Sequence, residues 1–195
     1  YFVNNKEKMI AFYENCRVLV TTEKLSEMGD IVNIIGEAHN NREPLLIIAD
    51  DVDGVALQTL LLNRTKQALQ LVAVRAPGYG PSRIDYLNDI CALTGAKLLG
   101  PETGSSTKKA TRNDLGTCQK IIVSRTSTTF VGGRGADLPK HIENLNVQLT
   151  DITLSSDIAQ LLKVRVASLV NGIAIIRVGG STELEMNERL DENKP

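Results

Sequence analysis

The sequence has few aromatic side chains and almost equal numbers of positive and negative charges. Phe, Trp and Tyr make up 4% of the 195 residues, and tryptophan is absent. Aromatic platforms for stacking nucleic-acid bases are therefore not expected. Lys and Arg number 22 against 23 Asp and Glu, giving a net charge of -1. A chain so balanced lacks the basic surface that binds nucleic acid or an anionic membrane, so we expect neither partner.

Cysteine and histidine are few and scattered. Cys16, Cys91 and Cys118 form no C-x-x-C pair, which favours buried, reduced thiols in a reducing compartment. His39 and His141 have no Cys or His at ligand spacing, so no metal site is expected.

Long apolar runs and targeting segments are also missing from the sequence. No apolar run approaches the roughly 18 residues that a membrane span needs, and no signal or transit peptide is recognisable. The chain starts at Tyr1 and Phe2 rather than at a methionine. These features suggest a piece cut from a longer protein.

Short apolar runs alternate with segments of helical periodicity, which predicts an α/β protein. The predicted strands are residues 16–20, 45–49, 69–76, 118–124, 128–131 and 173–178. The predicted helices are residues 26–41, 54–66, 82–93, 138–149 and 157–170. The order strand, helix, strand over residues 45–76 predicts a crossover between two parallel strands. Residues 4–15 and 97–116 are expected to be loops, and residues 132–135 a flexible turn.

The helix at residues 54–66 has more apolar residues than one core-facing stripe can hold. Ala56 and Leu60 make one stripe, whereas four other apolar residues fall largely outside it: Val55, Leu57, Leu61 and Leu62. The helix at residues 26–41 has a core stripe of Ile31, Ile34 or Ile35, and Ala38, with Val32 beside it. Both helices are either buried all round or form a groove that holds apolar side chains out for a partner.

An aspartate pair follows the strand at residues 45–49. Asp51-Val52-Asp53-Gly54-Val55 resembles the D-x-D-G-[TV] signature of haloacid dehalogenase-type phosphotransferases. That alternative would make Asp51 the nucleophile and Asp53 the general acid, with Mg²⁺ between them. No later G-D-x-x-x-D completes the metal site, so turn and helix-start residues are the favoured interpretation.

Longer stretches resemble the group I chaperonins, the GroEL family. They are PLLIIADDVDGVALQTLLLNR, APGYGPSRIDYLNDICALTGAKLL and NGIAIIRVGGSTELEMNER. The register holds almost without gaps from Tyr1 to about Gly135, and again from Arg165 to Glu188. The resemblance implies a GroEL-apical-domain-like fold of central β-sheets flanked by helices. Residues 1–172 would be the apical domain, and residues 173–195 its end and a short stub of the intermediate domain.

The resemblance also implies a function, that of a molecular chaperone. The family's apical domain binds non-native polypeptides and the mobile loop of a GroES-like co-chaperonin in one apolar groove between two helices. The matching positions here are Tyr1, Phe2, Val32, Ile35, Leu57, Leu61, Leu62 and Asn63. Glu183 matches a glutamate that contacts the neighbouring subunit of the family's ring. Val55 and Gln58 depart from the family's glutamate and alanine, which predicts an altered groove polarity.

The family's ATP-binding domain has no counterpart in this chain. The resemblance therefore implies no catalytic residue, cofactor or metal here, whereas ATP and Mg²⁺ would act in the full-length ring. The segment EKMIAFYENC is most similar to plastid-type chaperonins. This favours the plastid stroma of a chloroplast or apicoplast, with a bacterial cytoplasm or mitochondrial matrix as alternatives.

Overall fold

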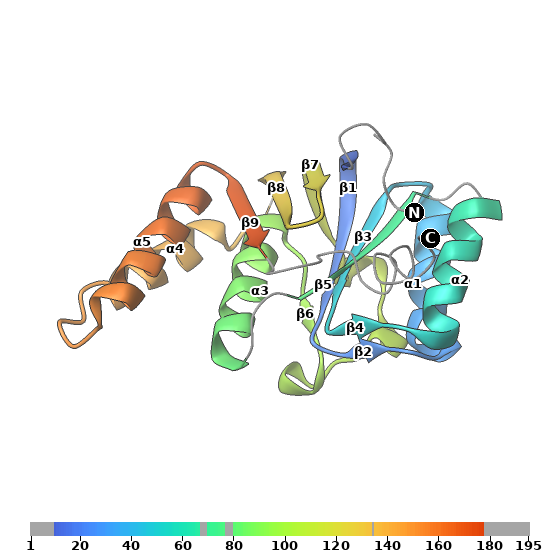
Figure 1. Ribbon diagram of the computed structural model, residues 1–195, viewed down its shortest axis with the longest axis horizontal. Coiled ribbons are helices and arrows are strands. Elements are labelled where there is room, and N and C mark those ends of the chain that lie inside the picture. The colour runs from blue at the N-terminus through green and yellow to red at the C-terminus, as the bar shows by residue number, and fades with distance from the viewer. Residues whose placement is uncertain (1–9, 67–69, 77–79, 134, 178–195) are drawn as a thin grey trace, which may run out of the picture.

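The computed structural model describes residues 10–66, 70–76, 80–133 and 135–177. They form an α/β protein in which helices flank a curled, mixed seven-stranded sheet (Figure 1). The sheet consists of β1 (Ala11–Thr21), β3 (Leu45–Ala49), β5 (Leu71–Arg75), β6 (Leu98–Leu99), β7 (Gly116–Val123), β8 (Ser127–Gly133) and β9 (Ile173–Arg177). A separate two-stranded pair consists of β2 (Lys24–Leu25) and β4 (Asp51–Val52).

Five helices and three short 3-10 turns connect these strands in the described residues. The helices are α1 (Met28–Asn41), α2 (Gly54–Lys66), α3 (Gly80–Thr94), α4 (Leu138–Gln148) and α5 (Ser156–Val170). The 3-10 turns are η1 (Pro101–Thr103), η2 (Thr107–Lys109) and η3 (Arg112–Asp114). In the described part of the chain, no helix is both long and apolar enough to cross a membrane.

The sheet has the order β5-β3-β1-β7-β8-β9, with β6 pairing the end of β1. β3 is parallel to both β1 and β5, which confirms the predicted crossover through α2. All five residues of β3 are buried, as expected for a parallel strand covered on both faces. β1 pairs with β7 in the antiparallel sense, so it separates the parallel and antiparallel parts of the sheet.

The first strand is longer than predicted. β1 begins at Ala11 rather than at Cys16, so the prediction of a loop through residue 15 is wrong. Ala11 and Tyr13 are buried while Phe12 and Glu14 are exposed. This alternation belongs to a half-buried antiparallel strand, and the polar Glu14 and Asn15 interrupt it in the sequence.

The first helix begins at Met28, two residues later than the predicted start at residue 26. Glu27, not Ser26, is the N-cap residue, and it forms a capping box with Asp30. The backbone N–H groups of Ser26 and Glu27 each donate to Asp30 Oδ2 at 3.0 Å. A carboxylate in the first turn satisfies amide groups that have no partner within the helix.

The segment at residues 97–116 is more ordered than predicted. It contains β6, η1, η2 and η3, and η2 packs along α1. Asn33 on α1 donates to the carbonyl oxygen of Lys108, and the Lys108 Nζ lies 3.9 Å from Asp30. Arg112 donates to Asn41 and lies 3.6 Å from Glu43. The basic residues of this segment therefore attach it to α1 and the loop that follows.

The glycines at the end of β8 and just after it pack closely against α3, so the prediction of a flexible turn is wrong for these residues. Gly133 pairs with Cys118 at the end of β8, and the Gly135 N–H donates to the Leu93 carbonyl at 2.9 Å. A Cβ at Gly133 would lie 1.9 Å from the Leu93 oxygen, so only glycine permits this approach to the end of α3. Arg134 lies outside the described residues.

The last two helices form a hairpin that extends beyond β9 at one end of the sheet, away from α1 and α2 (Figure 1). The predicted limits are confirmed to within a residue for both helices. Ser155 caps α5, its hydroxyl oxygen accepting from the Ile158 N–H at 3.2 Å. The buried side chains of the hairpin include Leu145, Leu162 and Leu169.

Candidate functional site

The candidate site is built on α1 and α2, which pack against each other at the end of the sheet opposite the α4–α5 hairpin (Figure 1). Each helix follows a short strand of the β2–β4 pair, and that pair fixes where both helices begin. The Asp53 N–H donates to the Leu25 carbonyl at 3.0 Å, and the Ala56 N–H donates to the Ser26 carbonyl at 3.0 Å. The start of α2 is thereby attached to the segment that leads into α1.

The outer face of α1 is apolar. Ile31, Ile34 and Ala38 are buried, as predicted. Val32 is 51% exposed, and Met28, one turn earlier, is also about half exposed. Ile35 is partly buried and packs against the core. Met28 is not among the predicted site residues, although its spacing of i, i+4 to Val32 and i, i+7 to Ile35 places it on the same stripe.

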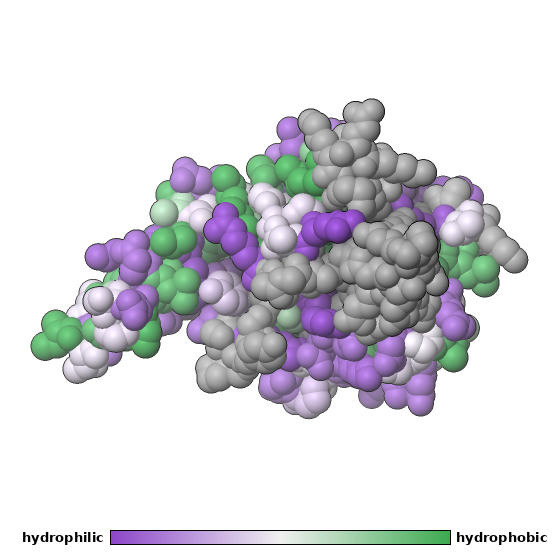
Figure 2. All heavy atoms as spheres, in the orientation of Figure 1, coloured by the Kyte–Doolittle hydropathy of each residue, from purple (hydrophilic) through white to green (hydrophobic). Residues whose placement is uncertain are grey.

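The outer face of α2 is partly apolar, with the polar Gln58 and Thr65 exposed beside two apolar side chains. Leu62 is 50% exposed, and Val55, two turns earlier, is also half exposed. Leu61 is partly buried and packs against the core. Figure 2 shows small apolar patches at this edge of the molecule, separated by hydrophilic surface.

Leu57 corrects the sequence-based expectation. Its position outside the core stripe predicts a side chain that extends toward a partner, but its exposed fraction is 0%. A helix that packs against both a sheet and a neighbouring helix buries two adjacent stripes, and the single-stripe projection overlooks the second one. Leu57 therefore lies beneath the outer face and supports it.

Asn63 follows Leu62 on α2. It is partly buried, and its amide donates to the Thr59 carbonyl one turn earlier at 2.8 Å. Gln58 is exposed, and its spacing of i+3 from Val55 and i−4 from Leu62 places it between them on the same stripe of α2. Three further predicted site residues, Tyr1, Phe2 and Glu183, lie outside the described residues.

We call the combined apolar face of the two helices the α1–α2 surface. It consists of Met28, Val32, Ile35, Val55, Leu61 and Leu62. None of these side chains carries a charge or a reactive group. Their chemistry is limited to removing apolar surface from water, which is non-directional and worth about 25 cal/mol per Å².

The aspartates after β3 are held in ion pairs. Asp50 lies 2.7 Å from Arg83, Asp51 lies 3.3 Å from Arg75, and Asp53 lies 2.9 Å from Lys24. Hydrogen bonds from the Ser26 hydroxyl and from Lys24 hold the pKa of Asp53 below its usual value. Within the described residues, no three His, Cys, Asp or Glu side chains gather where they could hold a metal ion.

The cysteines are free thiols in the described structure. Cys16 and Cys118 are buried as predicted, and they face each other on β1 and β7. Cys91 is only partly buried. Desolvation nevertheless raises the pKa of Cys91 to about 12, so its thiolate is scarce at neutral pH and nucleophilic chemistry is disfavoured.

A scan of the sequence against models of known protein families finds no match.

Proposed function

We propose that this chain is the polypeptide-binding apical domain of a group I chaperonin, a molecular chaperone. The observation that carries the proposal is the α1–α2 surface, where two adjacent helices hold uncharged apolar side chains half exposed to solvent. An isolated exposed apolar residue needs no explanation, but a set of them on neighbouring helices is typical of a binding surface. The resemblance of residues 44–64 to the GroEL family supports the same function.

The partners are non-native polypeptides and the mobile loop of a GroES-like co-chaperonin. Both would bind the α1–α2 surface, with Asn63 at its edge and Tyr1 and Phe2 contributing from the start of the chain. The full-length protein would form a ring, in which Glu183 contacts the next subunit, and would fold its clients with ATP and Mg²⁺ held by another domain. A plastid stroma is the proposed compartment.

Binding of a chemically denatured protein tests the proposal. Val32→Asp and Leu62→Asp each place a charge where an apolar side chain would be buried against the client. Each change is expected to weaken binding by about tenfold or more, the equivalent of one buried side chain. Fluorescence anisotropy with a labelled, denatured client would measure the affinity.

Val147→Asp is the matched control. Val147 lies on α4 with an exposed fraction of 62%, at least as large as that of Val32, but it lies outside the α1–α2 surface. It should bind the client as the unmodified chain does. An equal loss of client affinity in all three variants would contradict the proposal, because it would indicate non-specific hydrophobic binding. Mg²⁺-dependent hydrolysis of an aryl phosphate that Asp51→Asn abolishes would instead support the phosphotransferase alternative.

A further inference from the structure

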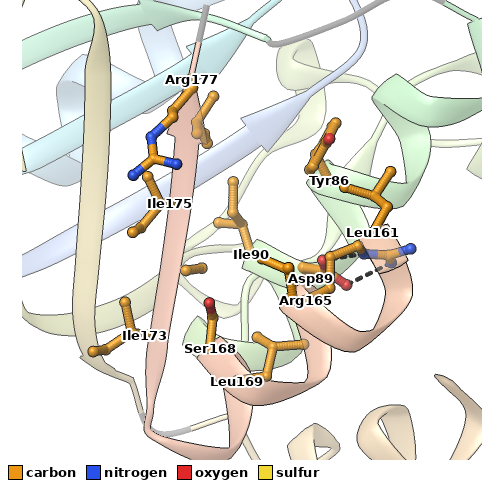
Figure 3. A pocket seen from close by; sticks show the side chains of 13 residues that line it. Tyr86, Asp89, Ile90, Leu161, Arg165, Ser168, Leu169, Ile173, Ile175 and Arg177 are labelled. Atoms are coloured by element: carbon orange, nitrogen blue, oxygen red, sulfur yellow. Dashed lines mark hydrogen bonds and ion pairs between the residues drawn. The ribbon is translucent and has the colours of Figure 1, made fainter. Parts of the chain in front are cut away.

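One buried carboxylate on α3 contacts both helices of the α4–α5 hairpin. Asp89 is 6% exposed. Arg165 on α5 donates to it twice, with Nε 2.7 Å from Oδ2 and Nη2 2.8 Å from Oδ1 (Figure 3). The His141 Nε2 on α4 lies 2.6 Å from Oδ1. Asp89 is thus the meeting point of three helices.

The apolar packing around this meeting point is incomplete. A cleft of about 160 Å³ lies between α3, α5 and β9 (Figure 3). Leu161 and Val164 on α5 line it and stay about half exposed. Apolar packing is non-directional, whereas a bidentate guanidinium–carboxylate pair fixes both distance and orientation. The ionic contacts of Asp89 therefore specify how the hairpin sits on α3.

The paired charges are costly to separate. The side chains of Asp89 and Arg165 are 8% and 10% exposed. Burial by itself lowers the pKa of Arg165, but its hydrogen bonds and attraction to Asp89 raise that pKa overall, so the guanidinium stays charged. Removal of one partner leaves the other charge buried without compensation. If the hairpin separates from α3, the remaining charged group is exposed to water and the cost of its burial is removed.

We propose that Asp89 is a latch that holds the α4–α5 hairpin on α3, and that the hairpin undocks as one unit when the latch is broken. The two helices also pack against each other, and each has its own contact with Asp89. Loss of either contact therefore loosens both helices, while β1, β3 and α2 keep their packing. Undocking would widen the cleft and expose its apolar wall. The inference does not depend on the function proposed above.

Hydrogen–deuterium exchange of the 195-residue chain, read by mass spectrometry, tests the latch. Asp89→Asn keeps the shape of the side chain and removes its charge. Protection of the amides in α4 and α5 is expected to fall by about 100-fold, with β1 and α2 unchanged. Glu143→Gln is the matched control, since it removes the charge of an exposed carboxylate on α4 itself, and it should leave protection unchanged.

A second variant keeps the test decisive if Asp89→Asn does not fold. His141→Ala removes the contact from α4 alone, yet a hairpin that moves as a unit should lose protection in α5 as well. Faster exchange in α4 only would overturn the proposal. So would unchanged exchange in α4 and α5, or an equal rise throughout the sheet, because the last result would make Asp89 part of the global core.

Discussion

At the scale of single residues, two leucines of α2 differ in solvent exposure, although helical periodicity predicts that both lie outside the core stripe. Leu57 is fully buried, whereas Leu62 is 50% exposed. Leu57→Ala should cost about 2–5 kcal/mol of unfolding free energy, because it leaves a cavity in the core. Leu62→Ala should change it by less than about 0.5 kcal/mol. Urea denaturation followed by circular dichroism would measure both, and equal effects would contradict these burial assignments.

The difference between these two leucines shows where sequence reasoning stops. Helical periodicity identifies both helices and the core stripe of α1, because local spacing determines which residues share a face. Periodicity does not reveal how many neighbours a helix has, so it places Leu57 at the surface. It also overlooks Met28, because a residue in the first turn of a helix has few neighbours in the pattern.

At the scale of elements, the sequence predicts most strands and helices because their apolar runs are bounded by clear turn residues. Asn171 and Gly172, for example, separate α5 from β9. The close contact between β8 and the end of α3 is not predictable, because it joins residues about forty positions apart. The glycines at that contact therefore resemble a flexible turn when the sequence is considered alone.

Two glycines with opposite surroundings test that contact. Gly133→Ala would place a methyl group 1.9 Å from the Leu93 oxygen, so the two elements must separate, at a cost of about 1–3 kcal/mol. A methyl group added to Gly36, inside α1, would meet no atom within 4 Å apart from the local backbone of α1. Gly36→Ala should stabilise the chain by about 0.5–1 kcal/mol, since alanine favours a helix. Thermal unfolding of both variants would reveal the signs, and a stable Gly133→Ala chain would contradict the close approach.

At the scale of the whole molecule, charge is nearly balanced and the α1–α2 surface carries none. Client binding should therefore keep its strength between about 0.1 M and 1 M salt, over which the Debye length falls from about 10 Å to about 3 Å. It should also show a negative heat-capacity change, the mark of apolar burial. Titration calorimetry at several temperatures and salt concentrations would measure both. A tenfold loss of affinity at high salt would indicate that charged groups dominate binding.

The position of β1 has a consequence for how the chain is made. β1 comes first among the described strands yet lies in the middle of the sheet, between β3 and β7. Its parallel neighbour β3 is complete once Ala49 has been synthesised, but β7 starts only at Gly116. At about 5–20 residues per second, the ribosome needs several seconds to supply that second partner. For that interval a growing chain presents an unpaired apolar strand edge, which is prone to aggregation. A chain proposed to bind other non-native polypeptides would thus pass through an aggregation-prone state during its own synthesis.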